Sequence, residues 1–271
     1  MTKVSSLEKY IVEIDKITEV MQLHTSTTTH PWFRGQSNFL WDLVPNIYRS
    51  NGDNFYEREL IRDFKLHSTQ YVSILPNDEL EWLFIMQHYS MPTRLLDWTE
   101  SYLIALYFAV LDYKLLDDAM VWILDPWILN EAVINQTSIP TTGHPLLKNY
   151  ILHNDHLSFD RQCQAKFPVA IRPIRTTRRI VAQKGTFTLH GSDASGLNKI
   201  CEKKFKIYDD KVILEGIKID GKSKLHILKQ LCCAGITHSV LFPGIEGLGK
   251  ELKFKYSNEY IGINGHIHSG F

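Results

Sequence analysis

Three short clusters in this sequence carry residue types that suit ligand binding better than a core or a plain surface. They are Phe33 to Gln36, Gln87 to Thr99, and Arg178 to Phe187. In the first, Arg34 offers a planar, permanently charged donor group that suits two-pronged capture of a phosphate or carboxylate. Gly35 lets a ligand approach the backbone closely. This cluster predicts an anion-binding position, but an arginine paired with a structural carboxylate ahead of a turn also explains the tripeptide.

The second cluster precedes the most hydrophobic stretch of the chain, Tyr102 to Leu111, which predicts a helix in the middle of the core. Polar side chains at the rim of a core are placed to bound a pocket. A structural explanation is also open, in which Arg94 pairs with Asp97 and Thr99 caps the helix. We expect Arg94 and Asp97 to form a buried, rigid ion pair in either case.

The third cluster includes Gln183 and Gly185. Glycine permits a bulge or a positive φ angle just before a strand, and such a backbone would aim Gln183 away from the sheet. A plain structural turn explains the same residues. The neighbouring Arg172, Arg175, Arg178 and Arg179 form a local basic stretch.

Composition excludes several other classes of protein. Lys+Arg and Asp+Glu balance at 30 each, so no global field attracts a polyanion. The four cysteines lack the Cys-x-x-Cys spacing of a zinc site, and His266 and His268 are a pair without a third ligand nearby, so we expect no metal. No signal peptide and no span of about 18 apolar residues is present, so we expect a cytoplasmic protein without membrane contact.

Periodicity predicts the elements that must position the clusters. We expect helices over 5–22, 54–73, 77–88 and 223–235, with caps at Ser5, Asn54, Asn77 and Ser223. We expect extended segments or strands over 32–36, 119–124, 169–174, 186–190, 211–219 and 239–242. Residues 130–166 are predicted to form an inserted excursion. The fold class is therefore α+β, with a helical N-terminal half packed on a mainly antiparallel sheet from the C-terminal half.

The clusters resemble the FRG domain family, which is named for the tripeptide at Phe33 to Gly35. Five ordered motifs carry the resemblance: Phe33–Gly35, Trp41–Arg49, Gln87–Thr99 with Ala105–Ala109, Gln183–Phe187, and Leu241–Leu248. Ser90 and Gly244 depart from the family pattern, in which Gly and Asp are expected. The resemblance implies one domain over residues 1–271 and a place in bacterial or phage conflict systems.

The order of the clusters is also similar to the ADP-ribosyltransferase superfamily, which implies a core of that type and NAD as the substrate. Arg34 would hold NAD through phosphate or ribose, and Gly35 would present backbone groups to the nicotinamide amide. Thr99 or Ser101 would orient the nicotinamide ribose, and Gln183 would meet its hydroxyls. Arg34, Thr99 and Gln183 would be the catalytic set. The other residues expected around NAD are Phe33, Gln36, His88, Tyr89, Thr93 and Phe187.

Gln183 stands where the superfamily commonly has Glu, so the chain departs from an acidic third position. Either a neighbouring acid such as Asp97 substitutes, or the protein binds NAD-like ligands without turning them over quickly. We therefore expect a transferase or NAD glycohydrolase that acts as a toxin or defence effector on a protein or nucleic-acid target, with a cognate defence-system partner. A non-catalytic nucleotide sensor and a nucleic-acid-acting protein stay open as alternatives. We also expect Arg34, Thr99 and Gln183 to line one cleft.

Overall fold

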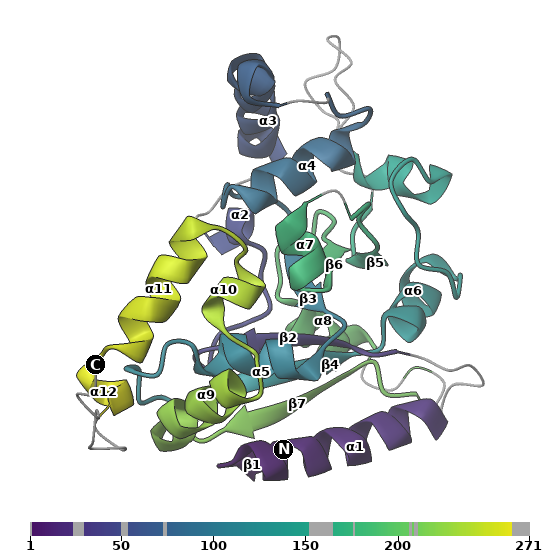
Figure 1. The fold of residues 1–271 in the computed structure, drawn as a ribbon. Coiled ribbons are helices and arrows are strands. Elements are labelled where there is room, and N and C mark those ends of the chain that lie inside the picture. The colour runs from purple at the N-terminus through teal and green to yellow at the C-terminus, as the bar shows by residue number, and fades with distance from the viewer. Residues whose placement is uncertain are drawn as a thin grey trace.

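The computed structural model describes residues 2–23, 30–49, 54–72, 75–151, 165–175, 177–205, 208 and 211–261 (Figure 1). The described strands form one mixed sheet in the order β1-β7-β4-β2-β3-β6-β5. They are β1 (Lys3–Val4), β2 (Trp32–Gln36), β3 (Leu95–Thr99), β4 (Ala119–Leu124), β5 (Val169–Ile171), β6 (Gly185–Leu189) and β7 (Leu214–Ile219). Only β1 and β7 pair in parallel; the other described pairs are antiparallel. The mainly antiparallel sheet is confirmed. Its predicted origin in the C-terminal half is wrong, because β1, β2, β3 and β4 come from the first half.

The sheet consists of two well-paired parts joined at one point. β2 pairs with β4 along its whole length, and β3 pairs in the same way with β6. Between β2 and β3 the register holds a single pair, Phe33 opposite Thr99. Beyond that pair the ladder is absent, so the edges of the two central strands leave backbone groups for other partners.

Helices cover both faces of the sheet (Figure 1). The helices are α1 (Leu7–Leu23), α2 (Asn46–Arg49), α3 (Asn54–Ser68), α4 (Glu79–His88), α5 (Tyr102–Val110), α6 (Pro126–Ile134), α7 (Arg178–Ala182), α8 (Leu197–Lys204), α9 (Lys224–Cys233), α10 (His238–Leu241), α11 (Ile245–Lys255) and α12 (Asn258–Ile261). Short 3-10 helices span Thr69–Tyr71, Pro145–Tyr150 and Gly221–Ser223. No helix among the described residues combines the length and apolar composition needed to cross a bilayer.

Three apolar cores hold these layers together. One core joins α1, α5 and α9 to β2, β4 and β7. A second lies on Trp32, Trp98 and Trp122 and includes residues of α6 and α8. A third packs α3 and α4 against β5 and β6. The predicted core helix is confirmed as α5, in which Ala105, Leu106 and Ala109 are fully buried.

Several predicted boundaries need correction. The Lys9 N–H donates to Ser6 Oγ at 3.3 Å, so Ser6 and not Ser5 caps α1. Asp78 and not Asn77 caps α4, because its carboxylate accepts from the Glu81 N–H. The predicted cap Asn54 is the first residue of α3, and its side chain lies outside the described residues.

Two segments have a different structure from the one that their composition indicates. The apolar run at 239–242 was expected as a strand from its Val, Leu and Phe, but most of it belongs to helix α10. The sequence pattern also predicts no strand over 95–99, where β3 lies at the centre of the sheet. Tertiary contacts override local propensity at both places.

The excursion expected over 130–166 is described only in part. It contains the end of α6 and the 3-10 helix Pro145–Tyr150, while residues 152–164 lie outside the described residues. Its first residue is tied to the sheet, because the Asn130 side-chain amide exchanges two hydrogen bonds with the backbone of Ala170 in β5, at 2.7 and 3.0 Å. A buried amide thus supplies the partners that a neighbouring strand would otherwise provide.

Helix α5 crosses β2 at Gly35 with almost no space between them. A Cβ atom on Gly35 would lie 1.9 Å from the Ala105 carbonyl oxygen and 2.5 Å from the Ala109 backbone nitrogen. Both contacts are to backbone atoms, which cannot rotate aside as a side chain can. The glycine is therefore required here by packing.

We expect Gly35→Ala to lower the free energy of unfolding by about 3 kcal/mol, because α5 must move away from the strand to admit a methyl group. Urea denaturation followed by circular dichroism measures this loss. Gly249→Ala in α11 is the matched control, since a Cβ there would meet nothing within 4 Å. In a helix this exchange should be neutral or stabilise by about 0.5 to 1 kcal/mol. Equal losses in the two variants would contradict the close packing of α5 on β2.

Candidate functional site

A pocket of about 270 Å³ lies where β2 and β3 separate. It collects residues from β2, α2, β3, α5 and α7, together with Ser37 and Trp41 after β2 and Gln183 after α7. The lining residues are Phe33, Arg34, Gly35, Gln36, Ser37, Trp41, Arg49, Asp97, Trp98, Thr99, Phe108, Arg179 and Gln183. Arg34, Thr99 and Gln183 therefore line one cleft, as the sequence analysis predicts. We call this cavity the Arg34 pocket.

Arg34 occupies the gap between the two strands. Its Nη1 donates to the backbone carbonyl of Asp97 at 2.6 Å and lies 3.8 Å from the Asp97 carboxylate. Its Nε is buried and has no hydrogen-bond partner among the described residues. Burial lowers the pKa of Arg34 to about 10; the Asp97 charge opposes this effect and the Arg49 charge adds to it. At neutral pH the guanidinium stays charged, and some of its five N–H donors make no hydrogen bond within the described residues.

Two further guanidinium groups line the same pocket. Arg49 Nε donates to the Val44 carbonyl at 2.8 Å. Arg179 Nη1 donates to the His88 carbonyl at 3.2 Å, and its guanidinium lies 4.9 Å from the centre of the Phe242 ring. These contacts use some of the five N–H groups of each arginine and leave the others available. Among the lining residues Asp97 is the one carboxylate, so positive charge prevails and an anionic ligand is favoured.

Thr99 and Gln183 are held by each other and by the backbone. The Thr99 hydroxyl donates to the Gln183 carbonyl at 2.7 Å and accepts from the Ser101 N–H at 3.1 Å. Gln183 Nε2 donates to the Leu241 carbonyl at 3.1 Å. The hydroxyl thus ties the end of β3 to the end of α7, and the Gln183 side chain ties α7 to α10.

The backbone around Gln183 differs from the one expected. Residues 178–182 form helix α7, and Gln183 is its C-cap. The positive φ angle, +47°, belongs to Lys184 and not to Gly185. A short helix followed by one left-handed residue therefore brings Gln183 to the pocket, where a glycine bulge was predicted.

Two other predicted residues, His88 and Phe187, line a smaller adjoining cavity of about 40 Å³. The two cavities share Asp97, Trp98, Arg179 and Gln183 as walls. His88 Nδ1 is buried and has no hydrogen-bond partner among the described residues. Burial and the nearby Arg179 charge lower the pKa of His88 below its ordinary value, which favours the neutral imidazole.

The remaining predicted residues have other surroundings. Gln36 lines the Arg34 pocket, but its amide oxygen accepts from Trp122 Nε1 at 2.7 Å and its amide nitrogen donates to the Asp42 carbonyl at 3.4 Å. Tyr89, Thr93 and Ser101 line neither cavity. Tyr89 is 67% exposed, while the buried Thr93 donates its hydroxyl proton to the Gln87 side chain at 2.6 Å.

Sequence reasoning did not select Trp41, Arg49, Trp98 or Phe108 as site residues, yet all four line the pocket. A signal for two of them was present, because Trp41 and Arg49 are the ends of the second motif in the family resemblance. Trp98 and Phe108 have the apolar character of core residues, and only 3% of the Trp98 surface is exposed. One edge of a core residue can still form a pocket wall.

The predicted ion pair between Arg94 and Asp97 is wrong. Arg94 pairs with Glu57 of α3 at 2.5 Å, and the two side chains are 1% and 0% exposed. The other nitrogens of Arg94 donate to the carbonyls of His190 at 3.0 Å and Tyr150 at 2.7 Å. The Asp97 side chain is 57% exposed and accepts from Gln87 Nε2 at 2.8 Å. Arg94 is therefore structural, and Asp97 faces the pocket.

Within the described residues, no group of three or more His, Cys, Asp or Glu side chains is placed to hold a metal ion. The pair His266 and His268 lies outside the described residues.

The fold and the pocket define a mixed α and β protein with an arginine-rich site at a break in its sheet. The model of the FRG domain family matches residues 29–117, which confirms the family resemblance over that segment. The matched segment includes β2, β3 and α5, and with them Arg34, Asp97 and Thr99. Arg179 and Gln183 lie beyond it. No curated protein and no solved structure matches the chain.

We expect Glu57→Gln to lower the free energy of unfolding by about 3 to 5 kcal/mol, because it leaves the Arg94 charge buried without its counterion. Asp97→Asn makes the same chemical exchange at an exposed position and should cost less than about 1 kcal/mol. Thermal and urea denaturation compare the two variants. A larger loss for Asp97→Asn would restore the pairing that the sequence suggested.

Proposed function

We propose that this chain binds NAD in the Arg34 pocket and cleaves its nicotinamide–ribose bond, as an ADP-ribosyltransferase or NAD glycohydrolase. The observation that carries the proposal is the meeting of Arg34, Thr99 and Gln183, which come from three separate segments, at the wall of one pocket. Each of the three also makes a structural hydrogen bond, but those bonds leave part of the Arg34 and Gln183 side chains on the pocket wall. A shared ligand gives one reason for all three.

The chemistry of the lining fits such a ligand. Arg34, Arg49 and Arg179 line the pocket and supply donors for a pyrophosphate. Phe33, Trp98 and Phe108 offer apolar surface for a ring. The pocket volume of about 270 Å³ is at the small end for ligand cavities. We therefore expect it to enclose the reacting end of NAD, with the rest of the dinucleotide extending toward the half-exposed ring of Trp41.

The proposed reaction needs charge support more than a covalent partner. When the C–N bond breaks, its electron pair leaves with the nicotinamide, which becomes neutral, and the ribose carbon becomes cationic. Water or a side chain of a target then attacks that carbon and loses a proton. Fixed positioning and electrostatic stabilisation supply most of the rate in such a step.

Asp97 is the residue that we assign to the cationic ribose. It is the carboxylate of the pocket, and it stands at the junction of the two cavities. Gln183 shares that junction but is neutral, and its amide nitrogen is engaged with Leu241. In this assignment Arg34 holds the phosphate end, Thr99 fixes the geometry of the strand end, and Gln183 offers its amide oxygen to a ribose hydroxyl.

A non-catalytic nucleotide sensor is the second candidate. It is favoured by the neutral Gln183 and by the Thr99 hydroxyl, whose proton is already donated to a carbonyl. A function in acting on nucleic acid has less support. Arg172 and Arg175 both pair with the Glu100 carboxylate, at distances of 3.5 and 2.6 Å. That pairing reduces the local basic stretch on which the alternative depends.

The setting that we propose is a bacterial or phage defence or toxin system. It rests on the family resemblance, which the match over residues 29–117 supports. The target of transfer would be a protein or a nucleic acid, and a cognate partner would control the activity. Incubation with NAD, followed by measurement of free nicotinamide and of labelled macromolecules, tests the activity directly.

We expect Arg34→Ala to lower the rate of nicotinamide release several hundredfold, since loss of one well-placed donor raises the barrier by about 3 to 4 kcal/mol. The matched control is Arg178→Ala, which removes an exposed arginine on α7 that does not line the pocket. It should keep the wild-type rate. Equal rates in the two variants, with both folded, would remove Arg34 from the site.

The pair Gln183→Glu and Asp97→Asn tests which residue supports the cation. We expect Gln183→Glu to preserve or raise nicotinamide release, because a second carboxylate of nearly the same size favours the cationic transition state. Asp97→Asn should lower the rate at least about tenfold. If neither the wild type nor Gln183→Glu releases nicotinamide while calorimetry still shows bound nucleotide, the sensor function takes first place.

A further inference from the structure

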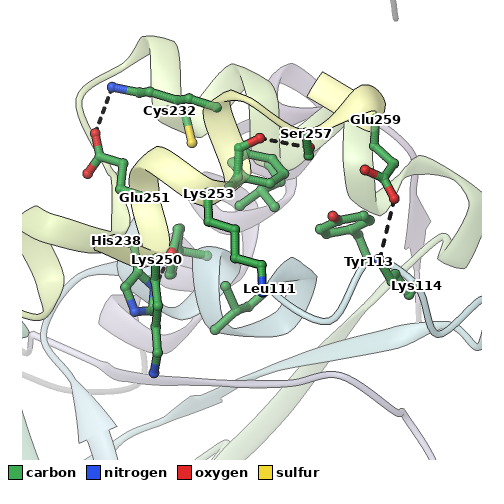
Figure 2. A pocket seen from close by; sticks show the side chains of 14 residues that line it. Leu111, Tyr113, Lys114, Cys232, His238, Lys250, Glu251, Lys253, Ser257 and Glu259 are labelled. Atoms are coloured by element: carbon green, nitrogen blue, oxygen red, sulfur yellow. Dashed lines mark hydrogen bonds and ion pairs between the residues drawn. The ribbon is translucent and has the colours of Figure 1, made fainter. Parts of the chain in front are cut away.

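A second and larger cavity, of about 400 Å³, lies on α5, α9 and α11 (Figure 2). None of its lining residues is shared with the Arg34 pocket. Its inner wall is apolar and is formed by Tyr107, Leu111, Tyr113, Leu228 and Phe254. Leu228 and Tyr107 belong to the first apolar core, so this wall is continuous with the interior. An apolar wall of this kind favours an apolar ligand body.

The rim of the cavity carries four lysines and two glutamates, and the pairing among them is uneven. Lys114 pairs with Glu259 at 3.4 Å, and Lys255 pairs with Glu251 at 2.7 Å (Figure 2). Lys250 and Lys253 form no ion pair with any described residue. Two positive charges at the rim are therefore without a counterion from the described part of the chain.

The Glu251 carboxylate does not offset those two charges. It is buried, and it accepts hydrogen bonds from Lys255 and from both the backbone N–H and the hydroxyl of Ser239. Burial alone would raise the pKa of Glu251, but the hydrogen bonds from Lys255, Ser239 and Thr237 outweigh it and hold the pKa at about 2. Its charge is thus already balanced within the protein.

His238 completes the cavity without adding charge. Its Nδ1 lies 3.0 Å from the Tyr107 hydroxyl, and its ring stacks on Phe242 with 4.4 Å between ring centres. Burial and the nearby Lys250 charge lower the pKa of His238, although the Glu251 charge opposes them, and this favours the neutral imidazole. The cavity therefore offers an apolar wall, a neutral polar pair and two free ammonium groups.

We propose that this cavity binds a small molecule with an apolar body and a single anionic head, with the body against Leu111, Leu228 and Phe254 and the head between Lys250 and Lys253. The two exposed ammonium groups attract an anionic head and repel a cation, and they give an uncharged molecule no comparable attraction. The site is separate from the Arg34 pocket, and its occupation does not depend on the function proposed for that pocket.

Titration calorimetry with two probes tests the proposal on the full chain. Dodecanoate carries an aliphatic body and 2-naphthoate an aromatic one, each with one carboxylate. The cation dodecyltrimethylammonium is the charge-reversed control. We expect at least one carboxylate to bind, more weakly as salt rises because the lysines are exposed, and the cation to bind much less. Absence of binding by both carboxylates up to about 1 mM, or equal binding of the cation, would overturn the proposal.

Variants locate the bound head. The combined Lys250→Gln and Lys253→Gln variant should raise the dissociation constant of the carboxylate about tenfold, since it removes two partly exposed ion pairs. Lys203→Gln with Lys204→Gln, on exposed positions of α8 outside the cavity, makes the same change in net charge and should leave the constant unaltered. Equal weakening in both double variants would show a nonspecific charge effect and reject the site.

Discussion

The single pair between β2 and β3 is the constraint on which the site depends. Phe33 lies opposite Thr99, and beyond this pair the strands follow different neighbours, β2 with β4 and β3 with β6. Gly35 holds β2 in place, because its missing side chain lets α5 lie directly on the strand. A break in the middle of a sheet exposes backbone groups that need partners, and the Arg34 guanidinium takes the carbonyl of Asp97. The pocket is therefore a consequence of how the sheet divides.

The other side of the break is fixed by two anchors at the ends of β3. At its start, the buried Arg94 binds Glu57 of α3 and the carbonyls of His190 and Tyr150. At its end, the Thr99 hydroxyl binds the Gln183 carbonyl. Asp97 lies between these anchors, so its backbone is held on both sides. Its carboxylate is exposed. A site built on strands anchored in this way keeps its geometry better than one built on loops.

Helices and strands that depend on local composition could be predicted from the sequence. Strand positions and ion pairs that depend on contacts between distant residues could not. The core helix α5 follows from a run of apolar residues, β4 and β7 from segments rich in β-favouring residues, and β2 from an aromatic pair. The convergence of Arg34, Thr99 and Gln183 was predicted from a family resemblance and not from spacing. β3 was missed because its central place depends on pairing with the distant β6, and the partner of Arg94 was misassigned because Asp97 is near in sequence while Glu57 is near in space. The requirement for Gly35 also came from packing on α5.

Arg34 and Arg94 show why residue type alone does not separate structure from function. Both are arginines with little exposed surface, and both donate to backbone carbonyls, Arg34 to Asp97 and Arg94 to His190 and Tyr150. For Arg94 a carboxylate and two carbonyls meet the guanidinium, so its burial is compensated within the fold. For Arg34 the buried Nε has no partner among the described residues, and the nearest carboxylate stays 3.8 Å away. A buried donor without a partner destabilises the fold by about 1 to 3 kcal/mol. The two arginines thus share a residue type, but within the described residues the burial of Arg94 is compensated and that of the Arg34 Nε is not.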